Sequence, residues 1–224
     1  MAPHPDDDLI GAGGSLLLHA RAGARVVSIH VIGRERSRLD EDVTDEQFAA
    51  ETALAATRLG VTESMSLNGA SRDFSLSREL RLAMVAILRR VRPDVVYLPH
   101  RDEIDQEHRQ VHDLAVDALW MASSEFFHSS GPDPMPLPEM VLGYEVWTPM
   151  RRYQYAEDIS SVIDQKVDAM QAYKSQLRHA AWDEAIRGLA AYRGAVAFGC
   201  GYAEAFEVIE LHRPAVRSAA RPAG

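Results

Sequence analysis

Residues 92–114 read RPDVVYLPHRDEIDQEHRQVHDL, and this stretch decides the fold class. Pro93 ends the basic amphipathic helix that we predict over residues 77–92, because proline cannot continue a helix. The short apolar run at residues 94–98 is typical of a buried strand. A further helix is predicted over residues 108–124, behind an acidic loop. A strand between two helices indicates a parallel sheet covered by helices.

The alternation of strands and helices extends in both directions from this stretch. A capping box at Thr44 and Gln47 opens a helix that stops at Gly60. We predict helices over residues 9–24, 44–59, 159–177 and 182–192, and strands over residues 25–31, 65–67, 140–147 and 206–211. The pattern predicts an α/β fold with a mainly parallel sheet. We expect one domain over residues 1–212, followed by a flexible tail over residues 213–224.

Composition excludes several classes of protein. The 224 residues are 46% hydrophobic and 25% charged, which excludes a disordered chain. A net charge of -9 argues against a nucleic-acid partner, because such proteins need a basic surface. The single cysteine, Cys200, excludes an internal disulfide framework. No apolar run approaches the ~20 residues of a membrane span, and no signal peptide opens the chain. We therefore expect a soluble, cytoplasmic protein without a membrane partner; the charge leaves a homo-oligomer open.

Histidine and aspartate gather in two segments of the chain. Residues 3–8 read PHPDDD, and residues 99–108 read PHRDEIDQEH. Both stand where a predicted strand ends and a helix follows. In open α/β sheets the chemistry collects at the carboxyl ends of the strands. We therefore expect the functional site to contain both segments.

The beginning of the chain conflicts with this fold. Only two residues precede the PHPDDD motif, so a strand before His4 has almost no residues left to form it. The first strand of a doubly wound sheet is central, and its loss leaves backbone groups unpaired and apolar surface unburied. We expect a truncated first strand, or a compensating strand from elsewhere.

The first segment has the chemistry of a metal site. His4 and the carboxylates at positions 6–8 are ligand types that suit Zn²⁺ or a similar divalent ion. Three consecutive aspartates repel one another unless a cation or water neutralises them. Pro5 stiffens the turn, so that one carboxylate can bind metal while its neighbour faces a substrate. The alternative is a solvated acidic turn.

The second segment offers a further ligand. His108 and His112 are four residues apart and can share one face of a helix. The string Glu-His-x-x-x-His matches a zincin site only loosely, because zincins carry the glutamate between the two histidines. We assign a metal role to His108 and expect His112 to be an ordinary solvated residue.

Four segments together resemble the LmbE-like (PIG-L) family of zinc-dependent N-deacetylases. They are the PHPDDD motif, the strand RPDVVYLP with its loop 103-EIDQEHR-109, the stretch over residues 166–176, and 201-GYAEAF-206. The first motif is highly specific, and the last two are moderately so. The resemblance implies a Rossmann-like three-layer sandwich. It also implies hydrolysis of an N-acyl amide, usually N-acetyl, on a small molecule that contains an amino sugar.

The resemblance also implies roles for individual residues. His4, Asp7 and His108 match the ligands of Zn²⁺ or another divalent transition metal. Asp6 matches the general base that activates the attacking water and later protonates the departing amine. A catalytic zinc site of this kind keeps a coordination position open for water.

Two positions depart from the family pattern. Asp105 stands where the family usually has a histidine that helps to stabilise the oxyanion, and an ionised carboxylate would repel that charge. Either Asp105 is protonated, or another donor replaces it; His100, His112, Tyr202 and the nearby arginines are candidates. Phe48 stands where the family often has an arginine that contacts the sugar. Arg34, Arg36 and Arg38 are candidates for the displaced contact.

Two alternatives belong to other functional classes. A metal-binding family member that has lost hydrolysis would serve as a binding or structural subunit, and Asp105 and Phe48 motivate this hypothesis. A dinucleotide-dependent oxidoreductase is disfavoured. The glycines at positions 11, 13 and 14 fit the G-x-G-x-x-G fingerprint badly, and the next predicted strand lacks the acidic residue expected at its end.

Overall fold

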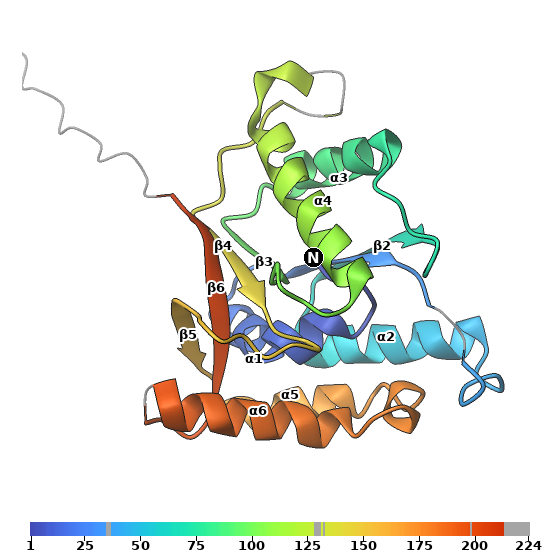
Figure 1. The fold of residues 1–224 in the computed structure, drawn as a ribbon, viewed down its shortest axis with the longest axis vertical. Coiled ribbons are helices and arrows are strands. Elements are labelled where there is room, and N and C mark those ends of the chain that lie inside the picture. The colour runs from blue at the N-terminus through green and yellow to red at the C-terminus, as the bar shows by residue number, and fades with distance from the viewer. Residues whose placement is uncertain (35–36, 128–130, 132, 198, 213–224) are drawn as a thin grey trace, which may run out of the picture.

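A computed structural model describes residues 1–34, 37–127, 131, 133–197 and 199–212 (Figure 1). The helices are α1 (Asp7–Arg21), α2 (Asp45–Leu59), α3 (Arg78–Val91), α4 (Gln106–Ser123), α5 (Ile163–Met170) and α6 (Trp182–Ala197). The strands are β1 (Val27–Ile32), β2 (Glu63–Gly69), β3 (Val95–Pro99), β4 (Met140–Tyr144), β5 (Tyr155–Asp158) and β6 (Ala203–Leu211). The predicted tail lies outside the described residues, and the single domain over residues 1–212 stays a prediction.

The strand pairings confirm the α/β class with a mainly parallel sheet. Strand β1 pairs with β2 in parallel, and β3 pairs with β4 in parallel. Strand β6 lies antiparallel between β4 and β5, which gives the order β3-β4-β6-β5. The sequence did not predict β5, because its four residues YAED carry too short an apolar pattern to mark a strand.

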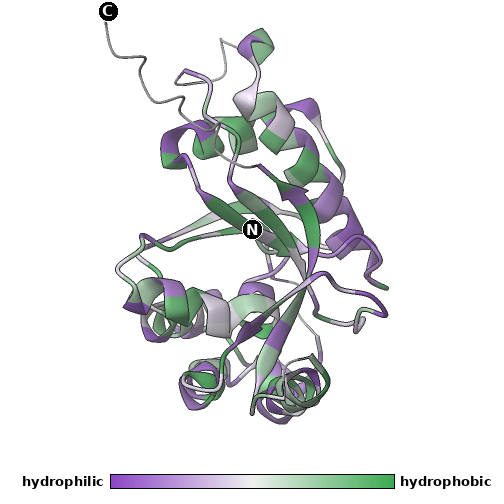
Figure 2. Cartoon of the chain, turned by 90° about the vertical axis from the view of Figure 1, so that its left-hand side faces the viewer, coloured by the Kyte–Doolittle hydropathy of each residue, from purple (hydrophilic) through white to green (hydrophobic). Residues whose placement is uncertain are grey.

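Two apolar cores lie on opposite faces of the strands. Helices α3 and α4 cover one face, and α1, α2, α5 and α6 cover the other (Figure 1). Apolar residues gather on the strands and on the inner sides of the helices, while hydrophilic residues face outward (Figure 2). This arrangement gives the three-layer sandwich, in which each helix buries one apolar stripe.

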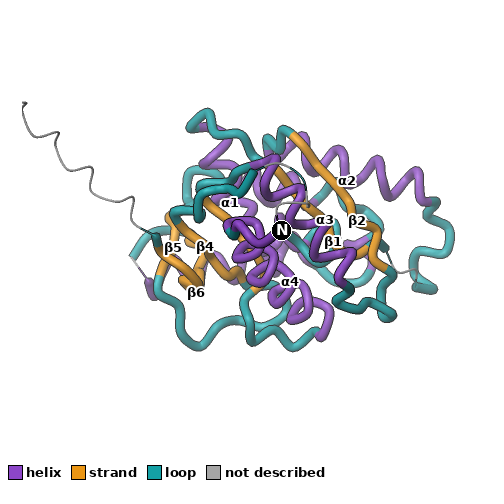
Figure 3. Tube along the Cα trace, turned by 90° about the horizontal axis from the view of Figure 1, so that it is seen from above, coloured by secondary structure: helices purple, strands orange, loops and turns teal. Residues whose placement is uncertain are grey.

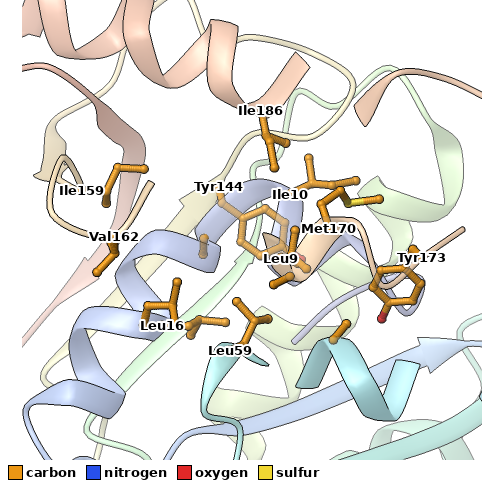
Figure 4. Packing of buried hydrophobic residues seen from close by; sticks show 14 of the residues in the cluster. Leu9, Ile10, Leu16, Leu59, Tyr144, Ile159, Val162, Met170, Tyr173 and Ile186 are labelled. Carbon is orange, nitrogen blue, oxygen red and sulfur yellow. The ribbon is translucent and has the colours of Figure 1, made fainter. Parts of the chain in front are cut away.

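Helix α1 approaches the sheet closely because it carries glycines. A Cβ atom on Gly11 would lie 2.1 Å from Cδ2 of Tyr144, and one on Gly14 would lie 2.6 Å from Cγ2 of Ile159. Tyr144 packs directly against α1 in the core (Figure 4). The close fit fixes the position of α1, whose first turn carries the PHPDDD aspartates.

The place of the first strand is taken by residues 1–3 alone. Ala2 forms an isolated parallel bridge with His30, and its N–H donates to the Ile29 carbonyl at 2.8 Å. The Met1 amine donates to the Tyr97 carbonyl of β3 at 2.7 Å. The expectation of a truncated first strand stays a prediction; within the described residues, no compensating strand pairs between β1 and β3. In Figure 3 the N-terminus lies between β1 and β2 on one side and β4, β5 and β6 on the other.

The helix predicted over residues 159–177 is shorter than expected. Ile159 is still extended, because its N–H donates to the Tyr202 carbonyl beside β5. Beyond Met170 the chain turns tightly, with Tyr173 N–H bonded to the Met170 carbonyl, and a 3₁₀ turn follows at Gln176–Arg178. Across the described residues, no helix has the length and apolar character needed to cross a bilayer.

Candidate active site

Three predicted side chains meet at the N-termini of α1 and α4. His4 stands in the turn before α1, Asp7 is the first residue of α1, and His108 lies in the first turn of α4. Oδ2 of Asp7 lies 3.2 Å from Nδ1 of His4 and 3.3 Å from Nε2 of His108. One ligand atom from each residue lies within 4.8 Å of the others. The fold therefore brings together two segments about a hundred residues apart.

The geometry and burial of this cluster fit a metal ion. Ligand atoms ~2.0–2.1 Å from a tetrahedral zinc ion lie about 3.3 Å from one another, which is the spacing found around Asp7. Both ring nitrogens of His108 are buried and have no hydrogen-bond partner within the described residues. A buried polar nitrogen without a partner is costly, and coordination of a cation by one of them would remove part of that cost.

A glutamate lies beside each of the two imidazoles, and the one beside His4 is within hydrogen-bond distance. Oε2 of Glu107 lies 3.0 Å from Nε2 of His4, and Oε2 of Glu103 lies 3.7 Å from Nδ1 of His108. Glu103 is itself fixed by the N–H groups of Val146 and Thr148, at 2.9 and 3.2 Å. Carboxylates commonly orient metal-binding histidines through their second nitrogen. Neither glutamate was predicted from the sequence, where the only signal was their position in the acidic segment that ends at His108.

The two neighbouring aspartates have opposite electrostatic environments. Burial raises the pKa of Asp6 to about 7, and the negative charge of Asp7 adds to the rise. Burial alone would raise the pKa of Asp7, but the charge of His108 and the contacts of His4 outweigh it and lower the pKa. Asp6 is the N-cap residue of α1, yet its side chain does not cap the helix. Its carboxylate is therefore available to exchange a proton near neutral pH, whereas that of Asp7 stays ionised.

The carboxylates around His4 stabilise its protonated, positively charged form. Burial opposes protonation of His4, but its hydrogen bond to Asp7 and the charges of Asp7 and Asp6 outweigh this and raise the pKa of His4 to about 9.

The third aspartate of the PHPDDD motif, Asp8, has a structural role. Asp8 accepts hydrogen bonds from the Leu9 N–H and the Ser28 hydroxyl, and so ties α1 to β1.

The contacts of Asp105 favour its ionised form. Its Oδ1 accepts the N–H of Glu107 at 2.8 Å and caps α4, while its Oδ2 lies 2.9 Å from the guanidinium of Arg72. Burial alone would raise the pKa of Asp105, but the Arg72 hydrogen bond and the helix N–H lower it. These contacts favour the ionised form of Asp105 over the alternative in which a protonated Asp105 donates to the oxyanion. Arg72, which was not predicted from the sequence, is the cation beside Asp105.

The other residues predicted to stabilise the oxyanion form contacts away from the metal cluster. Nε2 of His100 lies 2.8 Å from the Thr148 carbonyl, and His100 is buried. The expectation of a solvated His112 is wrong: it is buried, with Nδ1 2.9 Å from the Pro99 carbonyl, because the inner face of α4 packs on β3. The Tyr202 ring lies 5.9 Å from the guanidinium of Arg187 on α6, and Tyr202 has no described contact with the cluster.

One of the arginines predicted to replace the lost sugar contact, Arg34, lies beside Phe48. The guanidinium of Arg34 lies 4.8 Å from the centroid of the Phe48 ring and 2.7 Å from Asp40. An arginine therefore stands beside the position at which Phe48 replaces the arginine of the family pattern. Arg36, a second candidate, lies outside the described residues, and the third, Arg38, is exposed.

Known proteins resemble this chain in sequence and in structure. Diacetylchitobiose deacetylase from Thermococcus kodakarensis is 27% identical over 221 residues, covering 92% of this chain and 80% of that protein. The conserved protein TT1542 from Thermus thermophilus is 28% identical, with a TM-score of 0.83 over 98% of this chain and 97% of that one. The 4-carboxy-2-hydroxymuconate hydratase of Pseudomonas putida KT2440 shares the fold at 22% identity, with a TM-score of 0.82 over 95% of each chain.

The sequence also matches a family described as GlcNAc-PI de-N-acetylase, or PIG-L. The match spans residues 1–119, which contain both segments of the candidate site. Since it covers more than half of the 224 residues, this chain belongs to the PIG-L family.

Proposed function

We propose that this protein is a metal-dependent N-deacetylase that removes the acetyl group from an amino-sugar-containing small molecule. The observation that carries the proposal is the convergence of His4, Asp7 and His108 beside Asp6. The relative named diacetylchitobiose deacetylase, which aligns along most of both chains, supports the class of substrate.

Each residue of the site has a role in this proposal. His4, Asp7 and His108 hold the metal, and Zn²⁺ suits two imidazoles and one carboxylate. When bound, such an ion polarises the amide carbonyl and lowers the pKa of water toward ~7. Asp6 accepts a proton from the attacking water and donates it to the amide nitrogen as the C–N bond breaks. The products are acetate and a free amine.

Arg72 is our candidate for the group that stabilises the oxyanion. Its guanidinium lies 2.9 Å from Asp105 and 3.7 Å from Glu107, which in turn contacts His4. The side chain is 56% exposed, so a substrate can reach it from the solvent side. A positive charge here offsets Asp105 at the position where the family pattern has a histidine.

Replacement of Arg72 tests this role. We expect Arg72→Met to lower kcat by about 10²–10³-fold, the usual cost of one oxyanion donor, with a smaller change in KM. Arg72→Lys should retain part of the rate, because it keeps the charge and loses the planar donor. Arg21→Met, an exposed change on the last turn of α1, is the control. Equal rates for the Arg72 and Arg21 variants would remove Arg72 from the mechanism.

The activity itself is tested with purified protein reconstituted with Zn²⁺. We expect equal amounts of acetate, measured by NMR, and of primary amine to appear from N,N′-diacetylchitobiose or from other N-acetylglucosaminides. The metal-free protein should release neither. Stoichiometric metal binding without acetate release from any of these compounds would contradict the proposal and support the non-hydrolytic binding member instead.

A further inference from the structure

Two tryptophans form a partly exposed aromatic pair near the candidate active site. Trp147 lies in the loop after β4, and Trp182 is the first residue of α6. Their ring centroids lie 4.8 Å apart, and the ring planes make an angle of 72°. In an edge-to-face contact of this kind, Trp182 covers at most one face of the Trp147 indole. Because 53% of Trp147 is exposed, its ring is held by a neighbour and is still open to solvent.

The backbone of Trp147 is tied to the metal cluster through a glutamate. The Trp147 N–H donates to Oε2 of Glu103 at 3.3 Å, and Oε2 of Glu103 lies 3.7 Å from Nδ1 of His108. The other ring nitrogen of His108, Nε2, faces Asp7. The backbone of Trp147 therefore lies on the side of the His108 imidazole away from the metal cluster, with one carboxylate between them.

Exposed side chains connect Trp147 with the candidate oxyanion group. The Ile104 N–H donates to the hydroxyl of Thr148, the residue after Trp147, at 2.8 Å. Ile104 is 75% exposed, and the residue after it, Asp105, lies 2.9 Å from Arg72. A row of exposed side chains thus runs from Arg72 through Ile104 to Trp147, and its apolar end is at Trp147. Exposed apolar groups of this size beside a polar site are typical of ligand-binding surfaces.

An exposed indole beside an amino-sugar site suits a pyranose ring. The hydroxyls of a glucosamine ring are equatorial, so its two faces carry C–H groups. Stacking of one such face on an indole buries apolar surface of both rings, while the hydroxyls at the edge of the sugar stay in water. The ring that carries the N-acetyl group must place its amide at the metal cluster. Since Trp147 is attached beyond His108 and Glu103, the ring that reaches Trp147 is the next one along the substrate.

We propose that Trp147 is a specificity-determining residue that stacks on a second sugar ring, joined to the N-acetylated ring of the substrate. The substrate is then an N-acetylated disaccharide or a longer chain rather than a monosaccharide. Trp182 holds the indole in place through its edge-to-face contact. This inference rests on the proposed function, because it extends the same site. Stacking on a ring that does not react stabilises the bound substrate and the transition state equally, so it lowers KM and leaves kcat unchanged.

Binding to a slowly reacting variant tests the proposal separately from catalysis. In zinc-loaded Asp6→Asn, calorimetry measures the dissociation constants of N,N′-diacetylchitobiose and of N-acetylglucosamine. We expect the disaccharide to bind about tenfold more tightly, the ratio that one aromatic stacking contact provides. Adding Trp147→Ala should abolish this difference, and adding Trp147→Phe should retain part of it. Equal affinities for the two sugars with Trp147 present, or no binding of either sugar, would overturn the proposal.

Steady-state kinetics of the zinc-loaded active protein give a second readout. Trp147→Ala should raise KM for the disaccharide about tenfold and leave its kcat unchanged, and neither constant should change for the monosaccharide. Trp120→Ala is the matched control, because Trp120 lies toward the other end of α4, is 58% exposed and contacts Phe127 edge-to-face at 6.1 Å. This control should react with both sugars as the unmodified chain does.

The results distinguish failure of this inference from failure of the proposed function. Disaccharide preference that depends on Trp147, without acetate release, would support the stacking role and contradict the deacetylase activity. Acetate release with an equal effect of Trp147→Ala on both sugars would overturn the stacking role alone. A changed sedimentation coefficient of Trp147→Ala, together with such an equal effect, would identify a second copy of the chain as the partner of the indole and would also overturn the proposal.

Discussion

Asp6→Asn is expected to lower kcat by about 10²–10⁴-fold, the range associated with loss of a general acid–base group. The amide keeps the size of the carboxylate but cannot accept the proton of water. Because the Asp6 side chain neither caps α1 nor belongs to the three-residue cluster, the free energy of unfolding and the number of metal ions bound should stay unchanged. Initial rates of acetate release at saturating substrate measure the effect.

The control for this experiment is a second aspartate near the site. Asp102→Asn removes an exposed carboxylate from the loop before α4, and its rate should equal that of the unmodified protein. A fully active Asp6→Asn variant would show that another group accepts the proton. A variant that is inactive because it no longer binds metal would place Asp6 among the ligands instead.

Lys166→Met is expected to lower the free energy of unfolding by about 3–5 kcal/mol, the usual result of removing one partner from a buried ion pair. Nζ of Lys166 lies 2.6 Å from Glu204 and donates to the Ile10 carbonyl at 2.8 Å. Glu204 also accepts the N–H groups of Gly14 and Ser15, at 2.7 and 2.8 Å. The pair therefore ties α5 and β6 to the middle of α1, the helix that carries Asp6 and Asp7.

Urea unfolding measures this loss, with Lys174→Met as the exposed control on the same segment. Adding Glu204→Gln should recover part of the stability, because the double variant no longer buries an unpaired charge. The two effects should therefore be non-additive, as expected for groups in contact. A loss below about 1 kcal/mol in Lys166→Met, or additive effects in the double variant, would contradict this account of the pair.

Local signals in the sequence predicted the regular elements well. The capping box at Thr44 and Gln47 is present, and Gly60 ends α2 with a φ of 73°. The strand predicted over residues 94–98 is β3, displaced by one residue. The sequence-based predictions failed for elements whose existence or bounds depend on tertiary contacts. Strand β5 exists because β6 offers it an edge, and α5 begins late because Ile159 still pairs with the segment before β6.

The residues of the candidate site likewise fall into those that the sequence predicted and those that depend on tertiary contacts. The motif and the family resemblance pointed to His4, Asp7 and His108, whose convergence needed only the parallel sheet and the order of the segments. Glu107 and Arg72 could not be predicted, since their positions depend on how the loop after β2 folds against α4. The burial of His112 depends on which face of α4 meets β3, and spacing alone does not determine that face.

The fold does not fix the reaction. A hydratase shares this architecture over 95% of its chain. Function in such cases depends on the side chains of the site rather than on the scaffold. The metal cluster and its two supporting glutamates are therefore the part of the structure on which the proposed activity depends.

Titration of the metal-free protein with Zn²⁺ against a competing chelator tests this claim most directly. We expect one ion per chain, loss of binding in His108→Ala, and an affinity about 10–100-fold weaker in Glu107→Gln, which removes the carboxylate that contacts Nε2 of His4. Glu125→Gln, an exposed change beyond α4, should bind as the unmodified chain does. Failure of the unmodified chain to bind Zn²⁺, or undiminished binding in His108→Ala, would show that His4, Asp7 and His108 do not form a metal site.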